Sequence, residues 1–296
     1  MIELRACEGD ADLEAWRRVR IAVVPYERTD SVEELRRSAS TGRLLLLAYR
    51  DGELAGSGVS GRGDTASGFA IPRVLPEQRR CGVGTALLCM LAKHVETLGF
   101  PDLGVSVDDE DSLAFARRFG FEEVGRQVEQ VRAIAAGEPW PAVPDGIALV
   151  SLAERPELLG RLYHELALQA FEDMPTPRKV EITPEQWGAE WVTWPEATFA
   201  ALAGNEVVGM AGLIPDVDQP ERAENALTTV HRDFRGRGIA RALKETTIAW
   251  ASDRGLREIY TWTQTGNENM RSVNERLGYV TRTVSISLRR PLPLPA

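Results

Sequence analysis

The amino-acid sequence repeats itself once, at a distance the size of a domain. A valine, an arginine and a glycine of the first half recur 156 positions later (230 − 74), in the pairs Val74 and Val230, Arg79 and Arg235, and Gly82 and Gly238. The same offset relates Gly99 to Gly255. Gly120 and Gly278 are 158 positions apart (278 − 120), a difference of two that one loop insertion would produce. Solenoid repeats span only about 20–50 residues, so these five ordered landmarks predict a duplicated domain.

A proline-rich segment separates the two copies. Residues 137–146 contain three prolines and two glycines and show no helical period, which favours an extended linker. We therefore predict a first domain over residues 1–136, a linker over 137–146 and a second domain over 147–296. The length of 296 residues fits two domains.

Each half alternates short apolar strands with two main helices. Apolar stripes at helical spacing predict helices over 83–98 and 239–254, at the same place in each repeat. In the second half we also expect a longer helical region over 156–173 and one continuous strand over 224–230. Because several strands are joined by hairpin turns, the pattern predicts an α+β fold: two tandem domains, each a mixed, mostly antiparallel sheet flanked by helices.

Composition and charge exclude several classes of protein. The chain has 35 Lys and Arg against 44 Asp and Glu, a formal charge of −9, so we expect no nucleic-acid and no membrane partner. No apolar run approaches the ~18 residues of a membrane span, and the N-terminus lacks a signal-peptide core. The odd count of three cysteines fits a cytoplasmic protein. His94, His164 and His231 lack metal-ligand spacing, so we expect no metal.

The most informative motif lies where a strand passes into the main helix of each half. Small residues open that helix and let a ligand approach the backbone: Gly82, Gly84, Gly238 and Ala240. The first turn of a helix has unpaired N–H groups and a positive dipole end, which suit a pyrophosphate. Arginines in the same loops add charge and forked donors: Arg79, Arg80, Arg235 and Arg237. Neither loop matches a P-loop or a Rossmann glycine pattern.

These motifs resemble those of the GCN5-related N-acetyltransferase (GNAT) family. Its acetyl-CoA loop has the pattern Gln/Arg-x-x-Gly-x-Gly/Ala and begins five residues after a valine on a splayed strand; residues 79–84 and 235–240 both match. Its next motif is an Asn followed by a short helix that ends in Leu-Gly-Phe/Tyr, which residues 267–279 resemble closely and 109–121 less well. The overall plan is similar to that of tandem GNAT enzymes, including mycothiol synthases and antibiotic-pathway acetyltransferases.

The resemblance implies an acetyl-CoA-dependent N-acetyltransferase and a set of residues that bind acetyl-CoA. In the second half these are Thr228, Thr229, Val230, Arg235, Gly236, Arg237, Gly238, Ile239, Ala240 and Asn267. In the first half they are Val74, Arg79, Arg80, Gly82, Val83 and Gly84. The family polarises the thioester carbonyl with a backbone N–H at the end of the splayed strand, which implies this catalytic role for Val230.

A carboxylate is expected to take the proton of the attacking amine. We predict Glu224, because it lies six residues before Val230 and strand alternation would place both on one face. Asp216 and Asp218, on the preceding loop, are alternative bases, and a solvated carboxylate at the start of a strand is the non-catalytic interpretation of Glu224. His231 follows Val230 directly and is a further candidate to line the site.

Both halves depart from the family pattern at one position. Many members carry a Tyr seven residues after the Asn, as the acid that protonates the leaving thiolate, and here Ala116 and Asn274 stand at that position. Asn274 can still hydrogen-bond the thiol, whereas Ala116 cannot. The first half also has Asp109 in place of the Asn. The C-terminal half is therefore predicted to be the catalyst, and the N-terminal half either binds CoA without turnover or is structural.

For the acceptor we predict a primary amine of a small molecule. Trp187, Trp191 and Trp194 fall where GNAT folds place their acceptor-binding helices, so they form either an aromatic wall or core packing. A protein or peptide amine and a catalytically silent CoA-binding protein are the alternatives, and nucleic-acid binding through residues 235–237 fits the net charge poorly. The expected assembly is a monomer or a homodimer.

Overall fold

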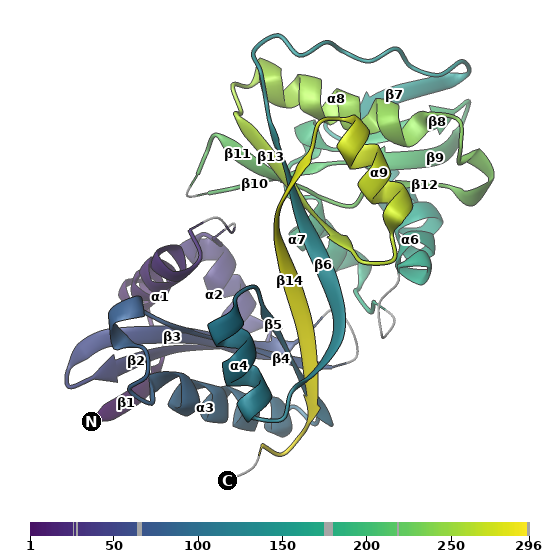
Figure 1. The fold of residues 1–296 in the computed structure, drawn as a ribbon. Helices are drawn as coiled ribbons and strands as arrows, with labels where there is room; N and C mark the ends of the chain where they lie inside the picture. The colour runs from purple at the N-terminus through teal and green to yellow at the C-terminus, as the bar shows by residue number, and fades with distance from the viewer. Residues whose placement is uncertain (26, 28, 64–66, 175–179, 218, 295–296) are drawn as a thin grey trace. The chain divides into compact units, whose positions relative to one another are not determined.

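The computed structural model describes residues 1–296 except 26, 28, 64–66, 175–179, 218 and 295–296. The chain forms two compact units (Figure 1). Unit 1 consists of Met1–Gly125 and Ser285–Ala296, and unit 2 consists of Arg126–Val284.

The compact units differ from the two sequence repeats, because the last strand of each repeat is exchanged. β6 (Glu122–Ala133) begins in unit 1 and pairs in unit 2 with β13 (Glu258–Gln264). β14 (Val280–Pro291) begins in unit 2 and pairs in unit 1 with β5 (Asp102–Val107). The predicted boundary at 137–146 concerns the repeats, whereas the units are divided within these two crossing strands.

The sheet of unit 1 has the order β1-β2-β3-β4-β5-β14. Its remaining strands are β1 (Ile2–Ala6), β2 (Leu44–Arg50), β3 (Glu53–Arg62) and β4 (Gly68–Val74). Neighbouring strands are antiparallel except β4 and β5, which are parallel. Side-chain alternation along β2 sends Leu46 and Ala48 into one core and Leu45 and Leu47 into another, so both faces of the sheet are buried.

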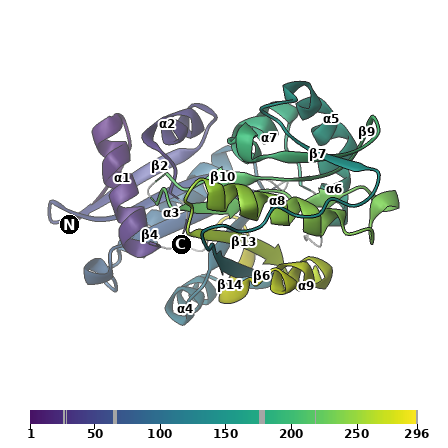
Figure 2. The ribbon, with the colours of Figure 1, turned by 90° about the horizontal axis from the view of Figure 1, so that it is seen from above.

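Helices cover both faces of this sheet (Figure 2). The helical segments are α1 (Asp10–Val23), α2 (Val32–Ser40), η1 (Pro76–Gln78), α3 (Val83–Thr97) and α4 (Glu110–Arg118). α3 packs Leu87 and Leu91 into one core, and α1 packs Trp16 into the other. α2 was not predicted from the sequence, although Ser31 and Glu34 form the reciprocal capping box that starts it.

Unit 2 contains strands in the orders β6-β13-β11-β10 and β12-β9-β8-β7. Its remaining strands are β7 (Ile147–Ser151), β8 (Phe199–Ala203), β9 (Glu206–Ala211), β10 (Leu213–Pro215), β11 (Arg222–Asn225) and β12 (Thr229–Val230). β11 and β13 are parallel, and the other neighbours are antiparallel. The continuous strand predicted over 224–230 is wrong, because β11 and β12 belong to different sheets and residues 226–228 connect them.

Helices cover both faces of the strands of unit 2 as well. The helical segments are η2 (Pro156–Leu158), α5 (Leu159–Arg161), η3 (Leu162–Ala167), α6 (Leu168–Asp173), α7 (Pro184–Trp191), η4 (Pro195–Ala197), η5 (Arg232–Phe234), α8 (Ile239–Asp253) and α9 (Glu268–Arg276). α8 packs Leu243 into one core, and the predicted helix over 156–173, whose η3 part is a π-helix, packs Leu166 and Phe171 into the other. The predicted fold of two tandem α+β domains is confirmed.

The proline-rich segment over 137–146 is held along the outside of α8. The Glu138 N–H donates to Ser252 Oγ (3.2 Å), and Trp140 Nε1 donates to Asp253 Oδ2 (3.1 Å), both at the C-terminal end of this helix. At the other end, a Cβ placed on Gly238 would lie 4.0 Å from Pro144 Cγ. The segment therefore runs back along the helix and belongs to unit 2.

Candidate active site

Two parallel strands of unit 2 diverge where the site is expected. β11 and β13 pair at only three positions, the last of which joins Glu224 to Tyr260. Beyond that point β13 continues to Gln264 on its other neighbour, β6, whereas Thr229 and Val230 pair with β9 in the second sheet. The two strands thus separate beyond Glu224 and Tyr260. We call the region between the separating backbones the cleft.

The Val230 amide points into this cleft. The next amide, that of His231, donates to Val208 O on β9 (2.9 Å). Because consecutive N–H groups of a strand point to opposite sides, the Val230 N–H and C=O point away from β9. The Arg235 Nε donates to the Val230 carbonyl (3.1 Å), so the arginine of the loop folds back onto the end of this strand.

The loop that follows presents free amides at the start of α8. Gly236 and Gly238 adopt left-handed backbone conformations, with φ of 77° and 79°, which favour glycine. Gly238 is the N-cap of α8, and none of the described side chains caps that helix. A Cβ on Gly236 would meet no atom within 4 Å, so the space over the loop is open. Ile239 and Ala240 form the first turn of α8, whose amides and dipole suit an anion.

Unit 1 repeats this geometry. β4 and β5 pair only at Gly68 and Phe69 before they diverge, and Arg79 Nε reaches the carbonyl of Val74 (3.4 Å). Gly82, with φ of 85°, is the uncapped N-cap of α3, which begins with Val83 and Gly84. Arg80 takes the left-handed position that Gly236 holds in unit 2, with φ of 60°, although it has a side chain.

The predicted phosphate-binding arginines of unit 2 are already engaged within the protein. Arg235 and Arg232 both donate to the carboxylate of Asp173 on α6, and the bond from Arg232 is the main cause of the lowered pKa of Asp173. Arg237 donates to Asp233 O (3.0 Å), and its guanidinium carbon lies 4.7 Å from the centre of the Phe234 ring. These contacts shape the loop, and they leave the backbone amides as its open donors.

The other predicted cofactor-binding residues lie around the same cleft. Thr229 is buried in β12, and Thr228 Oγ1 is buried without a hydrogen-bond partner among the described residues. Asn267 is the N-cap of α9, where its Oδ1 accepts from the Met270 N–H (3.4 Å). The helix cap explains this asparagine in structural terms.

Asn274 lies in a buried polar network. Its side chain is fully buried on α9, and its Nδ2 donates to Gln130 Oε1 on β6 (2.9 Å) and to Thr263 Oγ1 on β13 (3.4 Å). Asn274 Oδ1 is buried and has no hydrogen-bond partner among the described residues. An orphan acceptor of this kind is rare in folded proteins.

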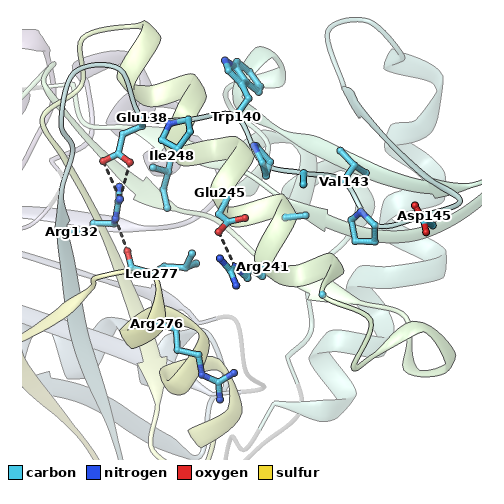
Figure 3. A pocket seen from close by; sticks show the side chains of 16 residues that line it. Arg132, Glu138, Trp140, Val143, Asp145, Arg241, Glu245, Ile248, Arg276 and Leu277 are labelled. Atoms are coloured by element: carbon cyan, nitrogen blue, oxygen red, sulfur yellow. Dashed lines mark hydrogen bonds and ion pairs between the residues drawn. The ribbon is translucent and has the colours of Figure 1, made fainter.

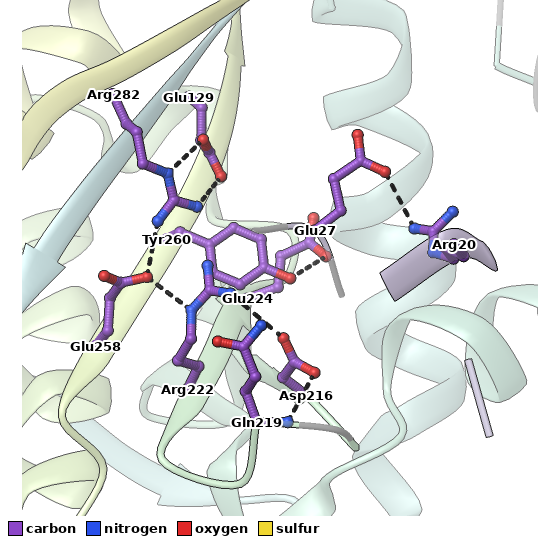
Figure 4. Close-up of polar contacts among 10 residues, drawn as sticks. All are labelled: Arg20, Glu27, Glu129, Asp216, Gln219, Arg222, Glu224, Glu258, Tyr260 and Arg282. Atoms are coloured by element: carbon purple, nitrogen blue, oxygen red, sulfur yellow. Dashed lines mark hydrogen bonds and ion pairs between the residues drawn. The ribbon is translucent and has the colours of Figure 1, made fainter. Parts of the chain in front are cut away.

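Glu224 faces a cluster of charged side chains around Tyr260 (Figure 4). The Tyr260 hydroxyl donates to Glu224 Oε2 (3.5 Å). The Tyr260 ring lies 4.7 Å from the guanidinium carbon of Arg222 and 5.9 Å from that of Arg282. Glu258 accepts from both arginines, at 2.7 Å and 3.0 Å. The cluster holds Tyr260 in place beneath the half-buried Glu224 carboxylate.

Two further acids complete this cluster. Glu129 on β6 is fully buried and accepts a forked pair of bonds from Arg282. Asp216 is also buried; its Oδ1 accepts from the Gln219 N–H (3.3 Å), and its Oδ2 lies 3.7 Å from Arg222. Asp218 lies outside the described residues.

The prediction that Glu224 and Val230 share one face of a strand is wrong. Ala223 and Val230 lie in the same core although an odd number of positions separates them, and Leu227 lies in the core of the opposite face. Strict alternation of side chains would send Ala223 and Val230 to opposite faces. The alternation therefore shifts by one residue between β11 and β12. The Glu224 side chain therefore points to the face opposite that of Val230, whereas the proposed role of Val230 belongs to its backbone.

A pocket of about 840 Å³ lies beside α8 (Figure 3). Its wall includes Gly238, the proline-rich segment and the C-terminal end of α9. Four of its charged side chains form ion pairs: Arg132 with Glu138 (3.0 Å) and Arg241 with Glu245 (2.8 Å). Sequence reasoning did not find this pocket, because it depends on how the segment over 137–146 lies against the helix.

The remaining candidates have structural explanations. Trp187 is fully buried in the core, Trp191 packs on Phe171, and Trp194 packs on Trp250, so core packing describes the tryptophans.

In the parts of the chain that the structure describes, no group of three His, Cys, Asp or Glu side chains is arranged to hold a metal ion. Over the same residues, no helix is long and apolar enough to cross a membrane.

Comparison with known proteins identifies the family. The acetyltransferase (GNAT) family matches residues 12–121 and 161–279, which together make up more than half of the chain. The chain belongs to the GNAT acetyltransferase family. It is therefore an N-acetyltransferase, and acetyl-CoA is its acetyl donor.

Individual relatives cover both halves or only one. The chain is 27% identical over 269 residues to the mycothiol acetyltransferase of Geodermatophilus obscurus, across 84% of this chain and 82% of the relative. It is 33% identical over 88 residues to N-alpha-acetyltransferase 30 of Schizosaccharomyces pombe, across 29% of this chain and 59% of the relative. A solved tandem GNAT protein from the clavulanic acid biosynthesis pathway matches 100% of both chains, with a TM-score of 0.78 and 16% identity.

Proposed function

We propose that unit 2 transfers an acetyl group from acetyl-CoA to a primary amine of a small molecule. The observation that carries this proposal is the divergence of β11 and β13, which aims the Val230 N–H into a cleft that ends at the open amides of α8. The cleft and the helix start supply the two contacts that an extended thioester with a pyrophosphate requires.

The residues of unit 2 fit acetyl-CoA. The amides from Gly236 to Ala240 bind its pyrophosphate, supported by the positive end of the α8 dipole. The main chain of Thr228 and the Val230 N–H, which point away from β9, bind its pantetheine arm along the cleft. Acetyl-CoA supplies the acetyl group in an activated form, as a thioester.

The chain contributes charge stabilisation and proton transfer. The Val230 N–H donates to the thioester carbonyl as negative charge develops there, a contact commonly worth about 3 kcal/mol. Glu224, oriented by the Tyr260 hydroxyl, takes a proton from the ammonium form of the acceptor, directly or through water, because only a neutral amine attacks. The thiolate that leaves takes up the proton that the attacking nitrogen loses when the amide forms. The resulting thiol donates to Asn274 Oδ1, which would satisfy this orphan acceptor.

Several differences support unit 2 rather than unit 1 as the catalyst. Parallel pairing places Phe69 beside Gly104, as it places Glu224 beside Tyr260, so unit 1 has a phenyl ring where unit 2 has the proposed base. Ala116 cannot hydrogen-bond a thiol. Asp109 is engaged as the N-cap of α4, where it accepts from the Ser112 N–H (2.8 Å).

Two lines of support favour a small acceptor. The relative named mycothiol acetyltransferase matches 84% of this chain, whereas the relative named N-alpha-acetyltransferase 30 matches 29% of it. The cluster below Glu224 contains four acids and two arginines, so its excess negative charge suits a cationic amine: Asp216, Glu129, Glu224, Glu258, Arg222 and Arg282. The proposal includes a cytoplasmic location, which fits the three free cysteines, and a monomer or homodimer.

Acetyl transfer to a panel of acceptors tests this proposal. The purified chain is mixed with acetyl-CoA and one of two sets of acceptors, and the release of thiol is followed. The small-molecule set contains amino sugars, polyamines and cysteine-linked sugar amines. The peptide set contains peptides with free N-termini and lysines. We expect turnover with members of the small-molecule set and none above background with peptides. Turnover confined to peptides would mean that the acceptor is a protein or peptide amine. Binding of acetyl-CoA without turnover on any amine would support a catalytically silent CoA-binding protein.

A further inference from the structure

Unit 2 buries a polar trio between α8, β11 and the start of β14. Lys244 Nζ donates to Asn225 Oδ1 (3.0 Å), and Asn225 Nδ2 donates to the Tyr279 hydroxyl (2.9 Å). The ammonium nitrogen also lies 5.1 Å from the centre of the Tyr279 ring. The exposed fractions of the three residues are 1%, 7% and 2%, so the trio is closed to solvent. Burial lowers the pKa of Lys244 to about 7, since no charged side chain among the described residues is paired with it.

The same positions of unit 1 are apolar. Lys244 corresponds to Leu88, at the offset of 156 (244 − 88) that relates the two helices, and Tyr279 corresponds to Phe121. Asn225 corresponds to Ala70, since each follows the last parallel pair of its strand by one residue. Leu88, Ala70 and Phe121 all lie in the apolar core of unit 1. The fold therefore does not require polar groups at these positions, and burying them is unfavourable by itself.

The trio stands directly before an extra residue in the splayed strand. The pair of Gly68 with Leu103 in unit 1 is equivalent to the pair of Ala223 with Ile259 in unit 2. From that pair to the valine at the end of the strand there are six positions in unit 1 (74 − 68) and seven in unit 2 (230 − 223). The additional residue falls between Asn225 and Val230, where the side-chain phase also slips. An inserted residue of this kind re-aims the strand that follows it.

The trio ties this bulge to the elements on both sides of the cleft. Asn225 is the last residue of β11 before the bulge. Lys244 lies on α8, whose first turn carries the predicted pyrophosphate site, six positions after its N-cap. Tyr279 follows α9 and is hydrogen-bonded through its backbone to Asn274 O (3.1 Å). One hydrogen-bonded chain therefore joins the helix start, the bulge and the Asn274 segment.

We propose that Lys244, Asn225 and Tyr279 form a positioning network that holds the bulged strand, and with it the Val230 N–H, in register with the start of α8. This inference rests on the proposed function of unit 2 as the catalyst. The three residues touch one another and the strand, and act on the reaction through Val230. Unit 2 has both the trio and the bulge, and unit 1 has neither.

The test replaces the trio with the residues that unit 1 uses. The variant Lys244→Leu/Asn225→Ala/Tyr279→Phe is compared with wild type in acetyl-CoA affinity, thermal unfolding and steady-state acetyl transfer. We expect a folded protein whose Kd for acetyl-CoA and whose KM values change by less than about threefold, and whose kcat falls at least tenfold. Hydrogen exchange of the amides over 226–231 should accelerate, while that of the amides over 245–253 stays as in wild type.

Thr246→Val serves as the matched control. This hydroxyl is also buried on α8 and accounts for one hydrogen bond, but the bond goes to Ala242 O of the same helix (2.8 Å). Its removal should leave kcat and the exchange of residues 226–231 unchanged. Equal losses in the control and in the triple variant would overturn the inference, since any buried polar group on the helix would then have the same effect.

The outcomes separate this inference from the proposed function. If wild type neither binds acetyl-CoA nor transfers acetyl groups, the proposed function fails. If wild type is active and the triple variant keeps its kcat, or loses activity only through weaker acetyl-CoA binding, the positioning network is refuted. Should the triple variant not fold, Tyr279→Phe decides, because it removes one acceptor only: an unchanged kcat refutes the network, and a kcat at least threefold lower at unchanged KM supports it.

Discussion

Replacing Lys244 with methionine should change stability in a way that depends on pH. Among the described residues the amine bonds to the Asn225 amide and to no carboxylate, and its pKa is lowered to about 7 from its ordinary value of 10.5. At about 1.4 kcal/mol per pKa unit, this difference corresponds to roughly 5 kcal/mol of unfavourable free energy when the buried amine is protonated. Methionine has a similar length and no charge, so the substitution removes that cost.

The folded and the unfolded chain differ in how many protons Lys244 binds. Between about pH 7 and 10.5 the unfolded chain holds the Lys244 proton and the folded chain does not, so the stability of wild type rises with pH across this window. Below pH 7 both states are protonated and the full cost of burial remains. The methionine variant lacks this slope, because it has no group that titrates at this position.

The variant also loses a hydrogen bond. Asn225 Oδ1 is left buried without the Lys244 donor, which costs about 1–3 kcal/mol at every pH. The variant should therefore be more stable than wild type by about 2–4 kcal/mol at pH 6.5. Near pH 9 the two effects offset each other, and at higher pH wild type should be the more stable protein.

Tryptophan fluorescence during thermal unfolding is a suitable assay. Six of the seven tryptophans lie in unit 2, so the signal reports the unit that contains the substitution: Trp140, Trp187, Trp191, Trp194, Trp250 and Trp262. We expect the variant to melt about 5–10 °C above wild type at pH 6.5 and no higher than wild type at pH 9.5. A difference in Tm that is the same at both pH values would refute the assignment of Lys244 as a buried, uncompensated amine.

Two further substitutions test the charged cluster. Glu224→Gln should lower kcat/KM by about 10²–10⁴-fold and remove the acidic limb of the pH–rate profile. The control Glu221→Gln, at an exposed position, should leave both unchanged. If the two variants have equal effects, Glu224 is not the base. Arg282→Leu should destabilise unit 2 by about 3 kcal/mol in urea unfolding, because it leaves the fully buried Glu129 unpaired. Adding Glu129→Leu should restore most of that loss, and a stable single variant would contradict the pairing.

The sequence predicts the ligand-binding loop of each unit well. Gly82 and Gly238 both occupy left-handed N-cap positions, where a side chain would be strained, so the glycine pattern and the backbone geometry have one cause. Arg79 and Arg235 both fold back onto the valine five positions earlier, which explains that spacing. Local backbone requirements of this kind are visible in a single sequence.

Long-range pairing is harder to predict. β6 and β14 have the alternating pattern of ordinary terminal strands, and nothing in their periodicity states that each pairs in the unit opposite to its own repeat. The register of the splayed strand is hidden for a related reason. Aligning the repeats on Val74 and Val230 conceals the extra residue, which is apparent only from the parallel pairs at Gly68 and Ala223.

Buried polar residues are also missed by pattern reasoning. Lys244 lies in an amphipathic helix where a lysine is normally solvated, and its full burial depends on Asn225 and Tyr279 from distant segments. Comparing the two repeats residue by residue is the signal that finds it, because Leu88 shows which side of the helix that position faces. Internal duplication thus provides a reference for which polar residues the fold itself does not need.

The central claim, that unit 2 holds the working site, is tested most directly by a matched pair of substitutions. Gly82→Trp and Gly238→Trp each place a large side chain at the left-handed N-cap of the ligand-binding helix of one unit. Calorimetric titration of acetyl-CoA and acetyl-transfer rates are measured for both variants. We predict that Gly238→Trp abolishes activity together with one binding event, whereas Gly82→Trp retains the wild-type rate. Full activity in Gly238→Trp, or its loss in Gly82→Trp alone, would contradict the claim.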